Sequence, residues 1–336
     1  MLTFRGFNHP GIAKACALTI GNFDGVHRGH QAMLALIRNE ARHRGVPSCV
    51  LTFEPHPRDY FAKVRIDPSL APARIATLRD KLTELDACGI DQCVVLPFNE
   101  KLSSLSPASF VHDVLIEGLG ASYVLVGDDF KFGAKRAGDY DFLMQSGATH
   151  GFEVARMNSY EVGGLRVSSS VVRAALGRAD FAQVEQLLGR PYSISGHVVH
   201  GRHLGRELGC RTLNVRFLNS AQSRAKSAAQ GIFVVEVLGL TPEPLAGVAN
   251  LGVRPTLDPN DVNGGRVLLE THILDWPKEL GQNSGYGRVV QVNLLHKLHD
   301  ELKYDGLEAL KHGIERDCAN AREWFNARRK KASETT

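Results

Sequence analysis

Ten residues near the amino terminus decide how the first half of this chain is expected to fold. They read Gly21-Asn22-Phe23-Asp24-Gly25-Val26-His27-Arg28-Gly29-His30. An apolar run at 15–20 precedes them, and an amphipathic helical pattern at 29–44 follows, with Gly45 as its stop signal. The ten residues are therefore predicted to join a β-strand to the first long helix, which is where parallel sheets bind ligands.

Outward from this loop, strand-like and helical stretches alternate. Further strands are expected at 48–53, 92–97 and 122–127, and helices at 73–87, 106–119 and 180–188. This rhythm is typical of βαβ units, and it predicts an α/β domain with a Rossmann-like parallel sheet at 1–188.

After residue 188 the pattern changes. Short β-like runs at 193–200, 231–238, 244–251, 268–274 and 288–295 are separated by glycine, proline and asparagine. They predict an antiparallel barrel or sandwich, which is followed by a terminal helix at 305–327. The second domain is placed at 189–328, and 329–336 is expected to be a frayed polar tail.

The composition is that of an ordinary globular enzyme in a reducing compartment. The 336 residues carry 40 Lys and Arg against 36 Asp and Glu, a formal net charge of +4, which does not demand nucleic acid as a partner. The six cysteines form no C-x-x-C pair, so they are interpreted as reduced thiols of a cytoplasmic protein. No signal region or membrane-spanning stretch is expected.

The chemistry of the first loop points to phosphate. Gly21 and Gly25 let the backbone approach a ligand closely, and the helix start offers unpaired N–H groups. His27 and His30 lie on one side of the first turn, where they can donate hydrogen bonds to phosphate oxygens. The alternative is a pair of surface histidines that cap a turn. A dinucleotide fingerprint and a Walker A loop are both absent from the sequence.

A second signature lies far along the chain. It reads Arg166-Val167-Ser168-Ser169-Ser170-Val171-Val172-Arg173. The serines suit the start of a helix, and Arg173 one turn later can grip phosphate oxygens. A plain capped helix with a surface arginine is the alternative.

Two more loops complete the pattern. They are Thr52-Phe53-Glu54-Pro55-His56-Pro57 and Gly127-Asp128-Asp129-Phe130-Lys131-Phe132-Gly133. The H-x-G-H loop is similar to that of the nucleotidyltransferase superfamily, and the four motifs together resemble the bacterial bifunctional riboflavin kinase and FAD synthetase family. That resemblance implies a first domain that adenylylates FMN with ATP and Mg²⁺, releasing pyrophosphate.

The resemblance also implies residue roles. His27 and His30 are the catalytic residues. ATP and its phosphates are assigned to Gly21, Asn22, Phe23, Gly25, Ser169, Ser170 and Arg173. Flavin contacts are assigned to Phe53, Pro55, His56, Pro57, Asp129 and Phe130, where aromatic rings can stack on the isoalloxazine.

The second domain carries a kinase-like signature without a P-loop. The stretch that begins at Gly205 and continues through Gly209 to Thr212 and Asn214 resembles the riboflavin kinase motif G-x-x-L-G-F-P-T-x-N, with Cys210-Arg211 in place of Phe-Pro. Gly205 and Gly209 permit a tight loop over phosphates. Thr212 and Asn214 offer hard oxygen ligands to Mg²⁺. By resemblance, Glu270 is the general base for the flavin hydroxyl.

Two alternatives stay open. The Cys210-Arg211 departure allows a monofunctional FMN adenylyltransferase whose barrel has degenerated into a flavin-binding module. A nucleic-acid-binding barrel fused to a nucleotidyltransferase is a second alternative, although no aromatic-rich basic strand face is visible. The main interpretation expects small-molecule substrates only, namely riboflavin, FMN and ATP, with FMN and FAD as products. It expects no nucleic acid and no membrane, and it leaves the oligomeric state open.

Overall fold

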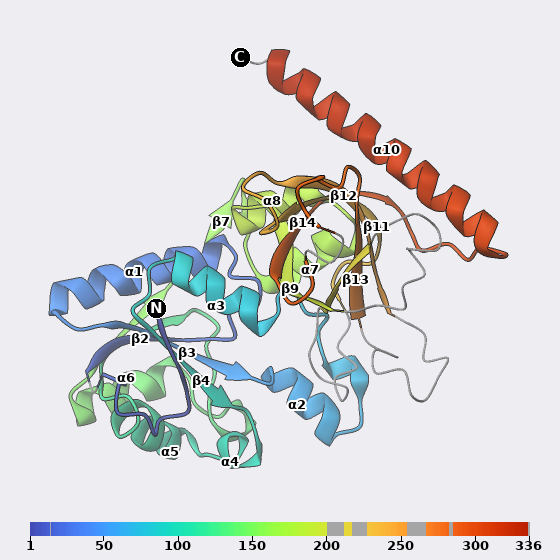
Figure 1. Cartoon of the computed structure of the whole chain (residues 1–336). Coiled ribbons are helices and arrows are strands. Elements are labelled where there is room, and N and C mark those ends of the chain that lie inside the picture. The colour runs from blue at the N-terminus through green and yellow to red at the C-terminus, as the bar shows by residue number, and fades with distance from the viewer. Residues whose placement is uncertain (14, 200–211, 217–226, 254–266, 282–284, 335–336) are drawn as a thin grey trace. The chain divides into compact units, whose positions relative to one another are not determined.

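The computed structural model describes residues 1–13, 15–199, 212–216, 227–253, 267–281 and 285–334. The chain divides into two compact units (Figure 1). The first consists of Met1–Pro72 and Asp80–Val171, and the second of Ala73–Arg79 and Val172–Thr336. The expected domain boundary at residue 188 stays a prediction.

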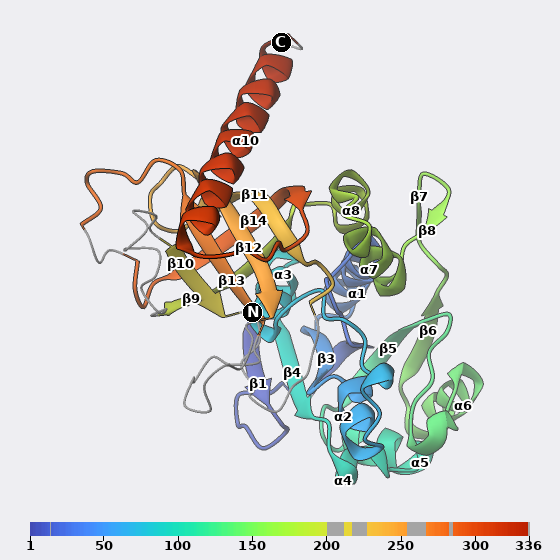
Figure 2. The same ribbon diagram turned by 90° about the vertical axis from the view of Figure 1, so that its right-hand side faces the viewer.

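The first unit is built on a six-stranded sheet in the order β1-β4-β3-β2-β5-β6, in which every neighbouring pair is parallel (Figure 2). The strands are β1 (Leu2–Arg5), β2 (Cys16–Ile20), β3 (Ser48–Glu54), β4 (Gln92–Pro97), β5 (Ala121–Gly127) and β6 (Glu153–Met157). The Rossmann-like prediction is confirmed. Strands β1 and β6 were not predicted, because both are edge strands with exposed residues and lack a continuous apolar run.

Helices connect these strands. They are α1 (Arg28–Arg44), α2 (Pro57–Val64), α3 (Leu78–Ala87), α4 (Glu100–Ser103), α5 (Pro107–Ser109), the π-helix η2 (Phe110–Ile116) and α6 (Tyr140–His150). Two short 3₁₀ helices, η1 (Pro68–Leu70) and η3 (Ala134–Arg136), and a hairpin of β7 (Glu161–Val162) and β8 (Leu165–Arg166) complete the loops. The first half of the chain ends in α7 (Ser169–Gly177) and α8 (Phe181–Leu188).

The helix expected at 73–87 begins only at Leu78. The reason is a backbone pairing that local periodicity does not reveal. The Arg74 carbonyl oxygen accepts a hydrogen bond from Ala228 N at 3.2 Å, and Arg74 forms a parallel bridge with Ser227. These residues are thereby held extended as part of the second unit.

The order of the strands places the first loop at a topological switch point. The chain builds outward from β2 through β3 and β4 on one side, and through β5 and β6 on the other. The loops that follow β2 and β5 therefore diverge from neighbouring carboxyl ends, the position where open parallel sheets bind ligands. Both motif loops, 21–27 and 128–133, start there.

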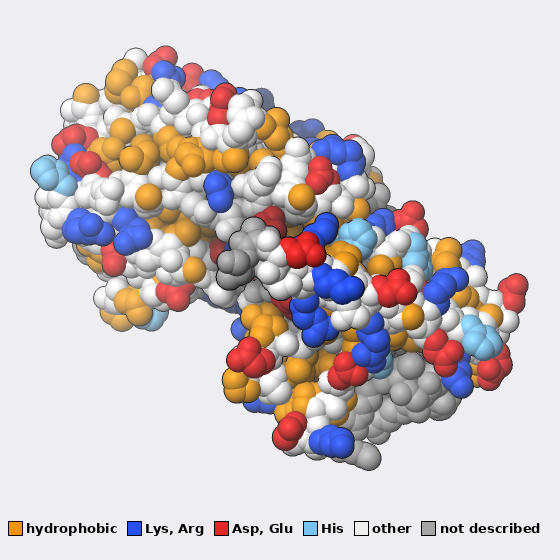
Figure 3. Space-filling view, turned by 90° about the horizontal axis from the view of Figure 1, so that it is seen from above, with side chains coloured by type: hydrophobic (Ala, Val, Ile, Leu, Met, Phe, Trp, Pro, Cys, Tyr) orange, Lys and Arg blue, Asp and Glu red, His pale blue; other side chains and the backbone are white. Residues whose placement is uncertain are grey.

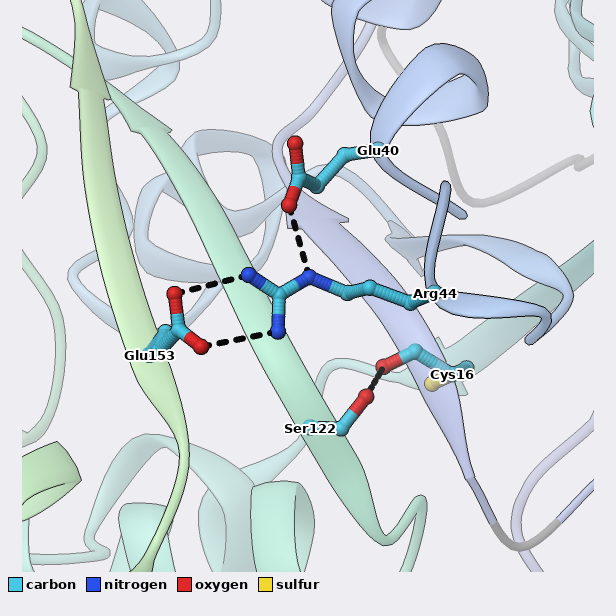
Figure 4. A network of polar contacts seen from close by, with 5 residues as sticks. All are labelled: Cys16, Glu40, Arg44, Ser122 and Glu153. Atoms are coloured by element: carbon cyan, nitrogen blue, oxygen red, sulfur yellow. Dashed lines mark hydrogen bonds and ion pairs between the residues drawn. The ribbon is translucent and has the colours of Figure 1, made fainter. Parts of the chain in front are cut away.

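A charged network anchors the far end of α1 (Figure 4). Arg44 Nε donates to Glu40 at 2.7 Å, and its two terminal nitrogens donate to both carboxylate oxygens of Glu153 on β6, at 2.9 and 2.7 Å. The nearby Ser122 hydroxyl donates to the Cys16 carbonyl oxygen at 3.2 Å across β5 and β2. The helix that begins at the site is thus tied to the sheet at its other end.

The second unit is a closed antiparallel barrel with the order β10-β13-β12-β11-β14-β9, in which β9 pairs back with β10. Its strands are β9 (Tyr192–Val199), β10 (Thr212–Arg216), β11 (Gly231–Leu238), β12 (Leu245–Val253), β13 (Val267–Ile273) and β14 (Val289–His299). The terminal helix α10 (Leu307–Glu334) packs Ala321 against Val234 and Val248 (Figure 1). The barrel prediction is confirmed.

The prediction of a helix end at residue 327 with a frayed tail is wrong, because α10 continues to Glu334. The extra residues include several arginines, lysines and an alanine, which are good helix formers. Arg328 also lies over the Trp324 ring, 5.3 Å from its centroid, and approaches Glu236 at 3.7 Å.

Candidate functional sites

The first site is built at the start of α1. His27 is the N-cap residue, and its Nδ1 accepts a hydrogen bond from His30 N at 3.2 Å. A neutral ring that accepts at Nδ1 carries its proton on Nε2, which is the nitrogen suited to donate to a phosphate oxygen. The two imidazoles stack, with ring centroids 3.6 Å apart and planes inclined by 13°. The predicted pair is therefore a single structural unit.

His30 is the less buried residue of this pair, although part of its ring is enclosed. Its ring also contacts Phe23, with 4.9 Å between the centroids, and its Nδ1 is buried without a hydrogen-bond partner among the described residues. Burial lowers the pKa of His30 well below its usual value, and the neighbouring His27 and Lys81 lower it further. The His30 ring can therefore act as a neutral hydrogen-bond donor.

The backbone of the loop is strained at several positions. Phe23 and Val26 have positive φ angles of 49° and 40°, and Gly25 has φ of 83°. A β-branched residue such as valine rarely adopts this conformation, which costs about 1–3 kcal/mol. Such strain is concentrated at functional sites, because a binding loop has to present its N–H groups in one arrangement.

Gly29 explains why the motif is H-x-G-H. A Cβ at this position would lie 3.3 Å from the His27 ring and 3.5 Å from the Val167 carbonyl oxygen. The missing side chain leaves room for the His27 imidazole and for the segment that leads into α7. Close packing against the His27 ring thus favours glycine here, whereas the backbone angle does not demand it.

The second signature meets the first loop in space. Ser168 Oγ accepts from Val171 N at 3.3 Å, which confirms the predicted serine cap of α7. Ser169, the first residue of α7, donates its hydroxyl to the Asp24 carbonyl oxygen at 3.0 Å, although 145 positions separate the two residues in sequence. Ser170 is exposed. Arg173 lies in the second unit, where its Nε donates to the Ala73 carbonyl oxygen at 2.7 Å.

The residues assigned to flavin fall into two groups. Phe53, at the end of β3, contacts Phe98 edge-on at 5.8 Å, and Phe98 also contacts Tyr60 and Phe61 of α2. Nothing in the local sequence of Tyr60, Phe61 and Phe98 marks them as neighbours of this site. Tyr60 and Phe61 meet Phe98, and Phe98 meets Phe53, because α2 and the residue after β4 converge near the end of β3.

His56 and Pro57 have a structural role at the start of α2. His56 is buried and its Nδ1 accepts from Arg58 N at 3.1 Å, while Pro57 is the first helical residue. Pro55 is exposed before them. Their contact with a flavin stays a prediction.

The loop after β5 presents the other group. Phe130 stacks on Phe132 with 5.4 Å between centroids, and Asp129 is exposed beside it. The neighbouring Asp128 accepts hydrogen bonds from Ser159 and from Arg166, the latter at 3.1 Å. These bonds, led by the one from Ser159, lower the pKa of Asp128 and keep it charged.

The second site lies on the barrel. In the strand register, Thr212 faces His272 across β10 and β13, and Asn214 faces Glu270. Glu270 in turn faces Asn250 on β12. Directly paired residues share one face of a sheet, so Asn214, Glu270 and Asn250 form a row across three strands.

This row lies on the outer face of the barrel, because the alternate residues Leu269 and Thr271 are fully buried inside. Asn214 is nevertheless 5% exposed, and Asn250 Oδ1 is buried without a hydrogen-bond partner among the described residues. Gly205, Gly209, Cys210 and Arg211 lie outside the described residues.

The described surface offers no single basic patch on the face in Figure 3, where lysine and arginine side chains are interspersed with acidic ones. No helix among the described residues is long and apolar enough to cross a membrane.

A histidine loop at the switch point of a parallel sheet, joined to a closed barrel with a polar row, defines a class of two-domain transferases that use nucleoside triphosphates. Family models match in the same order, FAD synthetase over residues 9–171 and riboflavin kinase over residues 188–325. The chain belongs to the family of bifunctional riboflavin kinases/FMN adenylyltransferases.

Relatives of this name cover nearly the whole chain. The protein from Pseudomonas fluorescens is 45% identical over 92% of this chain and 93% of its own length. The protein from Escherichia coli K12 is 43% identical over 97% of this chain and 98% of its own length. A crystal structure described as a macrolide-efflux protein from Streptococcus pneumoniae has a TM-score of 0.72 and 26% identity, covering 96% of this chain and all of that one.

Proposed function

We propose that this chain makes FAD from riboflavin in two ATP-dependent steps, one in each unit. The barrel phosphorylates riboflavin to FMN, and the parallel-sheet unit adenylylates FMN to FAD. The proposal rests on one observation: at each of two sites, motifs that are distant in sequence come together. Ser169 contacts the histidine loop at the first site, and Asn214 pairs with Glu270 at the second.

In the adenylylation step, an oxygen of the FMN phosphate attacks the α-phosphorus of ATP. The new phosphorus–oxygen bond forms as the bond to the bridging oxygen breaks, and pyrophosphate leaves with that electron pair. Nε2 of His27 and the imidazole of His30 donate to the phosphate oxygens as charge develops there. Catalysis consists mainly of positioning and charge stabilisation, without a covalent enzyme intermediate. By the family resemblance, Ser169 and Arg173 bind the β- and γ-phosphates.

In the kinase step, the terminal ribityl hydroxyl of riboflavin attacks the γ-phosphorus of ATP, and ADP leaves. Glu270 accepts the hydroxyl proton as the oxygen–phosphorus bond forms. Asn214 and Asn250 flank this carboxylate in the row. They orient the reacting groups without changing charge.

Mg²⁺ fits the residues of the second site. The row presents amide and carboxylate oxygens, and the Asn250 Oδ1 atom is buried with no partner of its own among the described residues. No group of three or more His, Cys, Asp or Glu side chains suited to a metal was found in the described part of the chain. Thr212 and Asn214 would therefore hold the ion together with ATP phosphates and water, as is usual for Mg²⁺. It would neutralise charge on the transferred phosphoryl group.

One assay tests both steps. The full chain is incubated with riboflavin, ATP and Mg²⁺, and FMN and FAD are separated over time. We expect FMN to appear first and FAD to follow, and supplied FMN to give FAD directly. If FAD forms only from supplied FMN, the barrel is a degenerate flavin-binding module, the alternative that the Cys210-Arg211 departure favours. If neither substrate gives FAD, the proposed function is wrong.

A further inference from the structure

A buried lysine that the histidine motif does not include lies beneath the first loop. Lys81 belongs to α3 and is 2% exposed, which is rare for a lysine. Burying an ammonium group is unfavourable unless other groups compensate for its lost hydration. The burial of Lys81 near the carboxyl end of the sheet therefore indicates a specific role for this side chain.

Two hydrogen bonds connect this cation to the loop. Lys81 Nζ donates to Thr52 Oγ1 at 3.3 Å, and the same hydroxyl donates to the Asn22 carbonyl oxygen, also at 3.3 Å. Thr52 lies near the end of β3 and is fully buried, so its rotamer is held by its surroundings. The ammonium group is thus linked through one hydroxyl to the loop that follows β2.

Lys81 also acts on His30. The charged or titratable neighbours that lower the pKa of His30 are His27 from the same turn and Lys81 from α3. Burial is the main reason that the pKa of His30 is low, and the two neighbours add to it. Lys81 therefore places a positive charge close to His30, whose own ring the low pKa keeps neutral.

We propose that Lys81 is a positioning residue of the adenylylation site, which fixes the Asn22 carbonyl through Thr52 and supplies a fixed positive charge beneath the two histidines. The loop conformation with positive φ at Phe23 and Val26 is held in part by this tether. The proposal rests on the adenylyltransferase function proposed above. It adds a residue from a helix outside all four sequence motifs.

The test uses the full chain and supplied FMN. Lys81→Met removes the charge and keeps most of the volume, and Lys101→Met, on the exposed helix α4, is the matched control. We expect Lys81→Met to raise the KM for ATP and to lower kcat, so that kcat/KM falls about 10- to 1000-fold. The control variant should have an unchanged kcat/KM. FMN formation from riboflavin in the same preparation checks that the protein is intact.

A second readout separates positioning from simple folding. In an NMR titration, the pKa of His30 should rise in Lys81→Met, because the repulsion from the ammonium is gone. Thr52→Val keeps the shape but breaks both hydrogen bonds, and Thr52→Ser should recover part of the kcat/KM that Thr52→Val loses. This pair tests the tether even if Lys81→Met fails to fold.

The outcomes are distinct. A folded Lys81→Met with unchanged kcat/KM and an unchanged His30 titration overturns the proposal, and so does an equal loss in Thr52→Val and Thr52→Ser. A wild-type protein that makes no FAD from FMN refutes the proposed function instead.

Discussion

His30→Ala is the sharpest test of the first site. The substitution removes one of the two imidazoles that we propose as donors to the phosphates, and it leaves the His27 cap of α1 in place. Loss of a single donor to a developing oxyanion costs about 10²–10³ in kcat, or about 2.7–4 kcal/mol. His30 is only partly buried as a residue, so water can replace some of its contribution. We therefore expect a loss of about 10- to 1000-fold in the rate of FAD formation from FMN.

The same contacts predict little change in stability. The ring loses its stacking on His27 at 3.6 Å and its contact with Phe23 at 4.9 Å. Aromatic contacts of this kind contribute about 0.5–1.5 kcal/mol each. The buried Nδ1 atom of His30 has no hydrogen-bond partner among the described residues. Removing such an atom removes a destabilisation of about 1–3 kcal/mol from the folded state. The two effects offset each other, so the Tm should stay close to that of the wild type.

The assay measures kcat for FAD formation at saturating ATP, with FMN formation from riboflavin as the internal control. His43→Ala, an exposed position in the last turn of the same helix, is the matched variant. An unchanged kcat at saturating ATP would remove His30 from the mechanism. A fall in kcat accompanied by a large fall in Tm would show that the offset worked out above is wrong.

Three further predictions follow from other residues. Glu270→Gln should abolish FMN formation yet spare FAD synthesis from supplied FMN, because an amide cannot accept the ribityl proton; equal loss of both activities would contradict separate sites. Cys210→Phe with Arg211→Pro should lower the kinase KM for ATP through a stiffer loop, and a raised KM would indicate that Arg211 binds phosphate. Asp317→Asn should lower the Tm more at pH 6 than at pH 8.5, and a difference independent of pH would refute this. Burial lowers the pKa of His299, but its bonds to Asp317 and Asp300 outweigh burial and hold it above the usual 6.5. The His299–Asp317 pair thus contributes its full stabilisation to the folded protein below about pH 6.5, and this contribution is lost as the pH rises through the raised pKa of His299.

The sequence by itself determined the class of each half and the position of its chemistry. Alternating strand and helix patterns predicted the parallel sheet. Short β-like runs with no long helix between them predicted the barrel, because the period of apolar residues is a local property of the sequence. The ten residues from Gly21 to His30 likewise contain both the helix start and its donors. The cap made by His27 and the stop at Gly45 are formed by neighbours in sequence, so they could be predicted.

Only the tertiary structure decided which distant residues meet. Nothing near Lys81 in sequence distinguishes it from a surface lysine of an amphipathic helix, and its burial depends on Thr52 arriving from another strand. The row of Asn214, Glu270 and Asn250 depends on the register of three strands, which is set by pairing over long separations. Residues 73–77 fit a helical period and nonetheless lie outside the helix, because Arg74 forms a bridge with Ser227 and accepts a hydrogen bond from Ala228 N. Local patterns specify the elements, whereas packing between elements selects the polar groups that become buried together.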